Sequence, residues 1–478
     1  MYARSDHTAP DPALPGPRGP DRGPAGGVGG SGSAGGAPSS GSCRGLTVPF
    51  ARNTAWGLAG SIVSGIAASG STVWLARWLS PEAHGQVQAA LSLLTVLSFG
   101  AQIGVVAATI HRVARAGSAP RLVVSTALAS VTGTGVSVAL ILALLREPVS
   151  STILVGLPPA GLLLVLATVI PLLWMQVLGG AARALDRFGD WTLAQASHQV
   201  LRLVALLIVA SLAPAGAVVA LGAVWLGQSG TTALVALRVL PGVGLTWRLR
   251  WPELREMTGF GLRTYAHTLA GQVHERLDLV LLAILDGDPA HLAAYAVAVG
   301  VVNRLRMLPL AMSAALFPRI AALADDDGAR FTAGVCRHAV LWTIALGLLL
   351  ALIAPVGVPL LFGPAYTASI QPLWILLPGT VALSVYLVLG RWFQAIDAQG
   401  INLASQVLGI GVNLILNLWW IPGHGLVGAA SASLVSYGLQ AVLVSIGFLR
   451  RGRVGFGRTF IAGRSDLRWY LDRIQRLG

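Results

Sequence analysis

Lysine is absent from this 478-residue sequence, and charge of either sign is scarce. The 33 basic residues are all arginine, Asp and Glu total 19, and charged residues make up 11% of the chain. A soluble domain carries about 25% charged residues, so this chain lacks the polar surface that such a domain needs. Hydrophobic residues reach 54% and the mean hydropathy is +0.71. The composition excludes an ordinary soluble protein and favours an integral membrane protein.

Cysteine is also nearly absent, and the common catalytic motifs are missing. Cys43 and Cys336 stand far apart, which excludes a disulfide framework or a cysteine metal site. The sequence has no HExxH, no phosphate-binding P-loop, no nucleophile elbow and no large extramembrane loop to hold an active site. We therefore predict a transporter rather than an enzyme, with no catalytic residue, no metal and no cofactor.

The two ends of the chain have few large apolar residues. Residues 1–48 are rich in Gly, Pro and Ser, which predicts a disordered cytoplasmic tail and not a secretory signal. Residues 450–478 form a basic cytoplasmic tail. Its segment 465–474 has apolar residues at helical spacing, which is typical of an interfacial amphipathic helix; a frayed basic tail is the alternative.

Between the tails lie long apolar runs of roughly 20–27 residues, long enough to cross a ~30 Å hydrocarbon core at 1.5 Å per residue. They predict an all-α integral membrane protein of about twelve transmembrane helices. The expected spans are 54–75, 86–108, 122–145, 154–180, 192–212, 215–238, 258–284, 291–317, 336–362, 369–394, 402–421 and 425–449.

The arginines orient these spans. With the N-terminus inside, the outside loops hold Arg77 and Arg146, whereas the inside loops and the C-terminal tail hold nearly all the others. This asymmetry follows the positive-inside rule and explains the basic charge better than nucleic-acid binding does. We predict both termini in the cytoplasm. Absent Lys beside abundant Ala, Gly and Arg suggests a GC-rich bacterial genome, hence a multi-pass protein of the bacterial plasma (inner) membrane.

A basic linker at 239–257 divides the spans into an N-terminal six-helix lobe, 49–238, and a C-terminal six-helix lobe, 258–449. A short repeat supports the division: Pro81 and His84 follow the first span of the first half, and Pro289 and His291 follow the first span of the second. Duplicated halves with a site between them are typical of transporters.

Ionisable residues inside the spans need an explanation, because each costs about 2.5–3.5 kcal/mol at the bilayer centre on insertion scales. In the seventh span Arg263, His267, His274 and Asp278 share one helical face. Glu275 borders this stripe and Arg276 points away from it. The stripe predicts a wall of a water-filled cavity or a pairing surface for another helix.

Other spans carry polar groups of the same kind. The fifth span contributes Gln195, His198, Gln199 and Arg202, and the eighth contributes Asn303 and Arg304. The tenth span contributes Arg391, and the eleventh contributes Asn402, Gln406, Asn413 and Asn417. Together they predict a polar, mostly cationic interior between the lobes. Structural alternatives stay open: hydrogen bonds between helices for Asn413 and Asn417, snorkelling for Arg263, and a local ion pair between Arg276 and Asp278.

Several segments, by their sequence and their order along the chain, resemble the polysaccharide-biosynthesis flippases of the multidrug/oligosaccharidyl-lipid/polysaccharide (MOP) exporter superfamily. They are LARWLSPEAHG at 75–85, RLD at 276–278 with YAVA at 295–298, LFPR at 316–319, and NLILN at 413–417 with GLVGAA at 425–430. The resemblance covers residues 50 to about 450; Ala293-Ala294 replaces the family's usual Gly before Tyr. It implies a MATE-like fold of two lobes around a central cavity, alternating access without ATP hydrolysis, and lipid-linked oligosaccharide substrates.

The expected function is therefore translocation of a polyprenyl-diphosphate-linked oligosaccharide for cell-surface polysaccharide biosynthesis. Arg suits phosphate oxygens bidentately, and Asn and Gln suit sugar hydroxyls. The expected diphosphate-binding residues are Arg202, Arg263, Arg304 and Arg391. The expected polar or gating residues of the cavity are His198, His267, His274, Glu275, Asp278, Gln406, Asn413 and Asn417.

The expected partners are the lipid-linked glycan, membrane lipid, and glycosyltransferases or a polymerase of the same pathway, with no nucleic acid. A lipid II flippase or a drug/cation antiporter of the same superfamily is the alternative. An antiporter would need acidic groups, and the spans offer few beyond Glu275 and Asp278. A membrane glycosyltransferase or polymerase fits less well, because the outside loops are too short for an active site.

Overall fold

The computed structural model describes residues 44–114, 119–246, 250–321, 323, 325–461 and 463. In these ranges the regular elements are helices, with no strand. The helices are α1 (Arg44–Trp78), α2 (Pro81–Gln102), α3 (Val105–Val113), α4 (Pro120–Leu144), α5 (Arg146–Thr152), α6 (Pro159–Ala184), α7 (Phe188–Leu212), α8 (Ala217–Val243), α9 (Trp251–Leu285), α10 (Pro289–Ala321), α11 (Asp325–Phe362), η1 (Pro364–Ser369), α12 (Ile370–Ala395), α13 (Gln399–Gly452) and α14 (Phe456–Phe460).

The prediction of an all-helical membrane fold is confirmed, whereas the count of twelve spans stays a prediction. Nine helices of the described part are long and apolar enough to cross a bilayer, or ten if α2 and α3, bent by 51°, form one span. The charged helix α9 is not among them. Helix α13 counts once, although non-helical Gly425 joins two helices there, in agreement with the expected break between 402–421 and 425–449.

Local sequence signals explain where several helices begin. The Ser80 hydroxyl accepts a hydrogen bond from the Ala83 amide, and Pro81 is the first residue of α2; both features favour a helix start. Asp288 in the same way accepts from the Ala290 amide at the start of α10. Helix α9 begins at Trp251, so the linker expected at 239–257 consists largely of helix ends. Pro252 and Glu253 in its first turn favour this earlier start.

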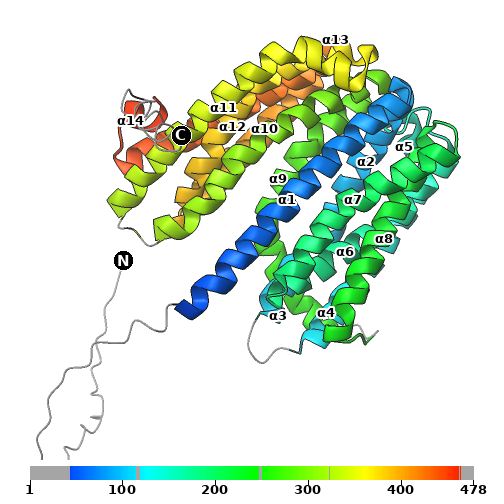
Figure 1. Cartoon of the computed structure of the whole chain (residues 1–478), viewed down its shortest axis with the longest axis horizontal. Helices are drawn as coiled ribbons and strands as arrows, with labels where there is room; N and C mark the ends of the chain where they lie inside the picture. Colours follow the sequence, from blue (N-terminus) through cyan, green and yellow to red (C-terminus); the bar gives the residue numbers. More distant parts are fainter. Residues whose placement is uncertain are drawn as a thin grey trace, which may run out of the picture. The chain divides into compact units, whose positions relative to one another are not determined.

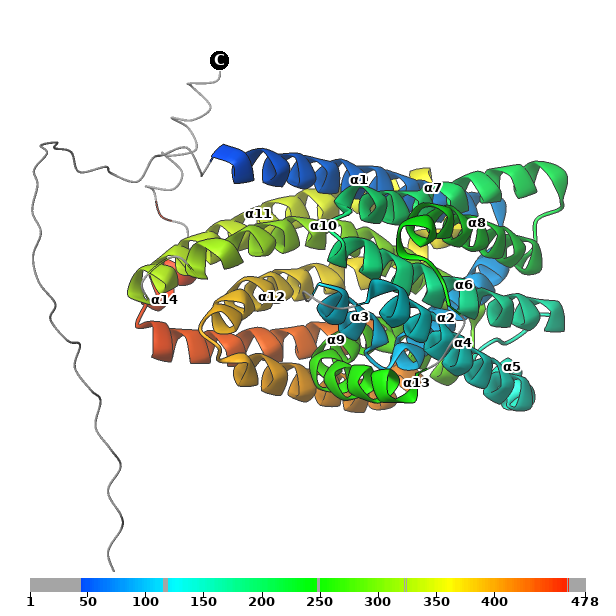
Figure 2. The ribbon, with the colours of Figure 1, turned by 90° about the horizontal axis from the view of Figure 1, so that it is seen from below.

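The described residues from Ala51 onward form one compact unit, in which the helices pack in two groups. One group contains α4, α6, α7 and α8, and the other contains α10, α11, α12 and α13 (Figures 1 and 2). Helix α2 contacts both groups. Helix α9 contacts α3, α4 of the first group, and α10 and α13 of the second. The lobe boundaries at 49–238 and 258–449 stay predictions.

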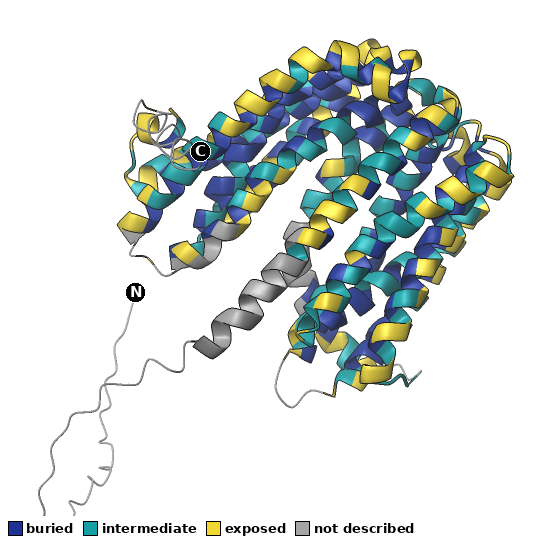
Figure 3. Ribbon diagram, in the orientation of Figure 1, coloured by how far each residue is buried: buried dark blue, intermediate teal, exposed yellow. Residues whose placement is uncertain are grey.

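The outer faces of the helices carry apolar side chains. On α11, Leu348, Leu352, Val356 and Leu360 are each more than 60% exposed, and their spacing of four residues aligns them on one face. Exposed and buried bands alternate along the helices in Figure 3. An apolar stripe of this kind is unfavourable in water and suits hydrocarbon, which agrees with a membrane protein.

Three predictions lie wholly or partly outside the described residues. Of the tail expected to be disordered, 1–48, residues 1–43 lie outside the described ranges. The amphipathic helix expected at 465–474 lies wholly outside them. The side chains of Arg263 and His267 are also outside the description, although the backbone there belongs to α9.

Candidate functional site

Three arginines from three helices meet at one cavity. Arg202 on α7, Arg276 on α9 and Arg304 on α10 line a volume of about 310 Å³. Helices α1, α2, α6 and α8 complete the wall. We call this space the arginine cavity. Its described lining residues include no Asp or Glu, so the cavity is strongly cationic.

Neighbouring helices hold two of these arginines in place. Arg304 Nε donates to the Ser69 hydroxyl on α1 at 3.0 Å, and its Nη1 donates to the Gly300 carbonyl at 3.1 Å. Helix α8 approaches the backbone of Arg202 so closely at Gly227 that a Cβ there would lie 2.7 Å from the Arg202 Cα. The Arg202 Nε is buried without a hydrogen-bond partner among the described residues. A buried unpaired donor is costly, so this group is available to an anionic ligand.

The rest of the lining is neutral, with an apolar part and a polar part, and the polar part matters for a ligand. It includes the side chains of Gln88, His198, Gln199, Gln228 and Asn303, together with three threonines. The cavity can therefore place guanidinium groups on an anion and amides or hydroxyls on its neighbours, which is the chemistry of phosphate recognition.

A second cavity lies on the other side of α9 and α10. It has a volume of about 370 Å³, and α9, α10, α12 and α13 supply its lining. Five side-chain amides, two tyrosines, a histidine and three charged residues surround it. We call it the amide-lined cavity; its polar lining residues are Gln272, His274, Glu275, Arg306, Tyr386, Arg391, Gln394, Asn402, Gln406, Tyr437 and Gln440.

Asp278 belongs to a separate buried network. Its carboxylate accepts hydrogen bonds from the Tyr295 hydroxyl at 3.2 Å, from Asn417 Nδ2 at 2.8 Å and from the Ser433 hydroxyl. Asn417 Nδ2 also donates to Asn413 Oδ1 at 3.0 Å. These donors come from α10 and α13, so the network ties α9 to both helices. Asp278 lines neither cavity.

The polar residues expected to share one cavity are thus divided among three places. Arg202, His198 and Arg304 line the arginine cavity. Arg391, His274, Glu275 and Gln406 line the amide-lined cavity. Asp278, Asn413 and Asn417 form the buried network, in which Asn417 bonds to Asp278 on another helix and to Asn413 within α13.

The sequence argument left out two arginines at these cavities. Arg276 does point away from the face of His274 and Asp278, but this direction leads it into the arginine cavity. The ion pair considered for Arg276 and Asp278 is not among the contacts of the described residues. Arg306 instead pairs with Glu275 at 2.6 Å. The sequence did contain a signal for Arg306, because a second arginine two residues after Arg304 lies inside the same apolar span.

A third cavity lies beside α6 and α7 of the first helix group and has a more apolar lining. Its volume is about 410 Å³, and α2, α3, α6 and α7 line it. The guanidinium of Arg183 lies 5.3 Å from the centre of the Trp191 ring, a cation–π distance. Gln102 donates to Gln176 across the cavity wall. No group of three His, Cys, Asp or Glu side chains suited to a metal ion occurs in the described ranges.

Comparison with known proteins supports this architecture. The chain is 24% identical over 197 residues to the "Probable low-salt glycan biosynthesis flippase Agl15" of Haloferax volcanii, and the match covers 40% of this chain and 41% of that protein. The match therefore spans about two fifths of the length of this curated relative.

Solved structures of transporters share the fold. The "Lipid II flippase MurJ, inward closed conformation" superposes with a TM-score of 0.70 at 10% identity, covering 83% of this chain and 90% of that one. An inward-facing multidrug resistance MATE family transporter of the MOP superfamily reaches 0.60 at 16% identity, covering 82% and 94%. The MATE multidrug transporter DinF-BH also reaches 0.60, at 17% identity, covering 88% and 96%.

A family model covers more than half of the sequence. The model of the polysaccharide biosynthesis proteins matches residues 50–324, a region that contains α2 to α10 and the three arginines of the arginine cavity. Together with the shared transporter fold, this match settles the family: the chain belongs to the polysaccharide biosynthesis protein family.

Proposed function

We propose that this protein translocates a polyprenyl-diphosphate-linked oligosaccharide across the bacterial plasma membrane for cell-surface polysaccharide biosynthesis. The observation that carries the proposal is the arginine cavity, where Arg202, Arg276 and Arg304 converge without a carboxylate in the described lining. The glycan flippase relative and the lipid II flippase fold support the same class of substrate.

The physical argument concerns charge inside a membrane. An arginine at the bilayer centre costs about 2.5–3.5 kcal/mol on insertion scales, so three of them at one cavity need a compensating anion. A diphosphate carries several acceptor oxygens and suffers the same cost there without a counter-charge. The planar guanidinium group binds phosphate oxygens bidentately. The cost of placing the arginines in the membrane and the cost of placing the diphosphate there therefore offset each other only when the diphosphate occupies the cavity.

Transport follows from alternating access of this cavity to the two sides of the membrane. We infer cytoplasmic termini from the arginine distribution, so the substrate enters from the end of the molecule that contains the α3–α4 and α8–α9 connections. The described part of the chain offers no nucleotide-binding motif, and the proposal includes no ATP hydrolysis by this chain.

The charge of the cavity argues against a drug/cation antiporter. An organic cation would meet three arginines in the arginine cavity, and Glu275 in the neighbouring cavity is already paired with Arg306. A lipid II flippase would use the same cavity chemistry, because lipid II is also a polyprenyl diphosphate. The experiment below therefore compares both lipids.

The test measures flipping in proteoliposomes that contain the full chain and a fluorescent polyprenyl-diphosphate glycan, and uses Arg202→Lys, Arg276→Lys and Arg304→Lys. Lysine keeps the charge but loses the bidentate geometry. We expect each variant to insert at wild-type levels and to flip about tenfold more slowly, as loss of one charge-assisted hydrogen bond predicts. Arg187→Lys is the matched control, because Arg187 pairs with Asp190 outside the cavity.

Unchanged flipping in all three variants would refute diphosphate binding at this cavity. Parallel assays with lipid II and with a fluorescent organic cation separate the alternatives. Faster transport of lipid II than of the glycan lipid would assign the protein to peptidoglycan synthesis, and transport of the cation alone would support the antiporter.

A further inference from the structure

The amide-lined cavity contains buried polar atoms that the protein leaves unpaired. Asn402 Oδ1, Gln406 Oε1 and His274 Nδ1 have no hydrogen-bond partner among the described residues. All three side chains are more than nine-tenths buried and line the same cavity. Unpaired buried polar atoms are rare and costly. Three of them around one space of about 370 Å³ point to a ligand that supplies hydrogen bonds.

The remaining contacts of these side chains show that the cavity is preformed. Asn402 Nδ2 donates to the Gly390 carbonyl at 2.8 Å, which fixes its amide and leaves Oδ1 as the available acceptor. His274 Nε2 lies 3.3 Å from Gln440 Nε2, and its ring packs edge-on against Tyr437 with centroids 5.3 Å apart. The polar groups are therefore held by the helices in fixed positions, as a specific binding site requires.

The chemistry of the lining suits a neutral, hydroxyl-rich ligand. Five amides and two phenols can each donate and accept hydrogen bonds, in the same way as the hydroxyl groups of a sugar. Two of the three charged groups compensate each other, because Arg306 pairs with Glu275. Arg391 keeps its charge, and its Nη1 donates to the neutral Gln394 Oε1 at 2.9 Å. The arginine cavity, by contrast, has no carboxylate in its described lining.

The two cavities are neighbours that share α9 and α10. Arg276 faces the arginine cavity, whereas the adjacent Glu275 faces the amide-lined cavity. Arg304 and Arg306 divide in the same way, only about 3 Å apart along the axis of α10. Asn303 lines the arginine cavity and accepts a hydrogen bond from Arg306 at 3.1 Å. A ligand whose charged group lies in the arginine cavity can therefore place the groups bonded to it in the amide-lined cavity, on the other side of α9 and α10.

We propose that the amide-lined cavity binds the sugar residues next to the diphosphate of the lipid-linked glycan. This inference rests on the proposed function, since it assumes that the diphosphate occupies the arginine cavity. It adds that the protein selects its substrate by the head group as well as by the diphosphate. Gln406 and Tyr386 are then specificity-determining residues, and Glu275 with Arg306 separates the two subsites.

The test measures binding to the purified full chain in lipid nanodiscs by native mass spectrometry. The probes are undecaprenyl diphosphate and the same lipid carrying one N-acetylglucosamine, one glucose or one galactose. We expect at least one sugar-bearing probe to bind about tenfold more tightly than undecaprenyl diphosphate, because a site built for hydroxyl groups discriminates against a ligand that lacks them.

Two variants locate that preference. Gln406→Leu and Tyr386→Phe should remove most of the advantage of the sugar-bearing probe and leave the affinity for undecaprenyl diphosphate within about twofold. Gln371→Leu is the matched control, since Gln371 lies on α12 with Tyr386 but is exposed and outside the described cavities. The thermal melting temperature of each variant shows that it is folded. Arg202→Ala should weaken binding of all the lipid probes.

Each outcome decides between the two proposals. Equal affinity of the wild type for all the probes would overturn the sugar subsite and leave diphosphate binding intact. A sugar preference that survives both variants would also overturn it. No binding of any lipid probe would overturn the proposed function. Free N-acetylglucosamine is a further probe: if it binds as tightly as its lipid-linked form, the cavity is a site for soluble sugar.

Discussion

Helices from the first and second halves of the sequence meet through glycine at two places, and the side chains beside these contacts differ. At the α2–α10 contact, Gly85 approaches the backbone so closely that a Cβ there would overlap the carbonyl of Pro289. At the α3–α9 contact, Gly104 and Gly261 meet in the same way. By the predicted topology the first contact is extracytoplasmic and the second is cytoplasmic. The backbone approach is common to both.

Neutral, buried side chains of α2 accompany the α2–α10 contact, and at the start of α10 His291 Nδ1 lies 2.8 Å from Asp286 Oδ2. His84, fully buried, is 2.8 Å through Nδ1 from the Tyr366 hydroxyl, and its Nε2 is 3.0 Å from Gln88 Nε2. Val87 and Leu292 beside it are buried in the main apolar core. Opening this contact would expose apolar surface and break buried hydrogen bonds, which makes the opening costly.

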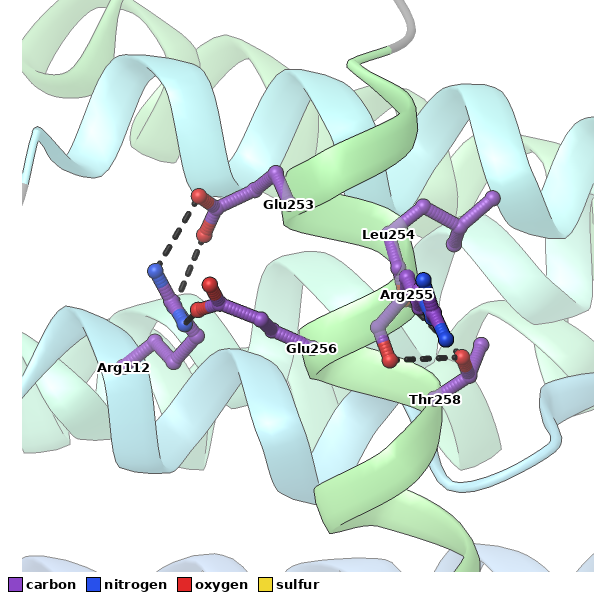
Figure 4. Close-up of polar contacts among 6 residues, drawn as sticks. All are labelled: Arg112, Glu253, Leu254, Arg255, Glu256 and Thr258. Atoms are coloured by element: carbon purple, nitrogen blue, oxygen red, sulfur yellow. Dashed lines mark hydrogen bonds and ion pairs between the residues drawn. The ribbon is translucent and has the colours of Figure 1, made fainter.

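Charged, partly exposed side chains accompany the α3–α9 contact. Arg112 Nε lies 2.7 Å from Glu253 Oε1, its Nη2 donates to Glu253 Oε2 at 3.0 Å, and its Nη1 pairs with Glu256 (Figure 4). Water reaches these groups, since the Glu256 side chain is 65% exposed. Ion pairs of this kind contribute about 0–1 kcal/mol and weaken with salt. The comparison indicates that the α3–α9 contact opens more easily than the α2–α10 contact.

The largest expected effect is at the α2–α10 contact. Gly85→Ala places a methyl group against the Pro289 backbone, which cannot move aside like a flexible side chain. We expect a destabilisation of about 1–3 kcal/mol or more, seen as a lower melting temperature and a lower level in the membrane. Gly100→Ala on the same helix has open space around it and should be neutral or stabilise by up to about 1 kcal/mol. Equal melting temperatures for the two variants would contradict the close approach.

An intermediate effect is expected at the α3–α9 contact. The double variant Glu253→Gln/Glu256→Gln removes the charge partners of Arg112, so the contact should open in a larger fraction of molecules, by up to about fivefold. Spin labels at Ala114 and Arg255 would report the distance between the two helices by double electron–electron resonance. The wild type should shift in the same direction as salt is raised, whereas the double variant should not respond.

Spin labelling requires that Cys43 and Cys336 be replaced first. The labelled protein that lacks both cysteines but keeps Glu253 and Glu256 gives the reference distribution of distances between the two labels. An identical distribution in the double variant at every salt concentration would show that the ion pairs do not hold the contact closed, and the glycine contact alone would then account for it.

The smallest expected effect is at the C-terminal end of α1. Arg77 is exposed, its Nε donates to the Leu361 carbonyl at 2.9 Å and its Nη2 donates to the Leu360 carbonyl, at the C-terminal end of α11. A cation near a helix C-terminus contributes about 0.3–1 kcal/mol. Arg77→Ala should lower the melting temperature slightly, and Arg77→Lys should restore part of the loss. Arg146→Ala, at the other arginine predicted outside, is the control; an equal loss there would remove any special role for Arg77.

The sequence predicted the membrane class and most helix positions, because apolar runs long enough to cross a bilayer leave the backbone few alternatives to helix. It missed the break at Ile103 and Gly104, where both residues have positive φ values inside an uninterrupted apolar run. It also did not indicate that the helix of the seventh span begins at Trp251, because the charged first turns of α9 do not look like a transmembrane helix.

The sequence by itself determined which polar residues lie inside the spans and, by helical periodicity, which of them share one helix face. Only the tertiary structure decided which faces meet. Helix α9 packs against both helix groups, so the face of His274 and Asp278 turns toward α13 while Arg276 faces Arg202 and Arg304. Periodicity fixes directions around a single helix axis; the relative rotation of neighbouring helices depends on packing at small residues such as Gly227 beside Arg202, which no single-helix pattern contains.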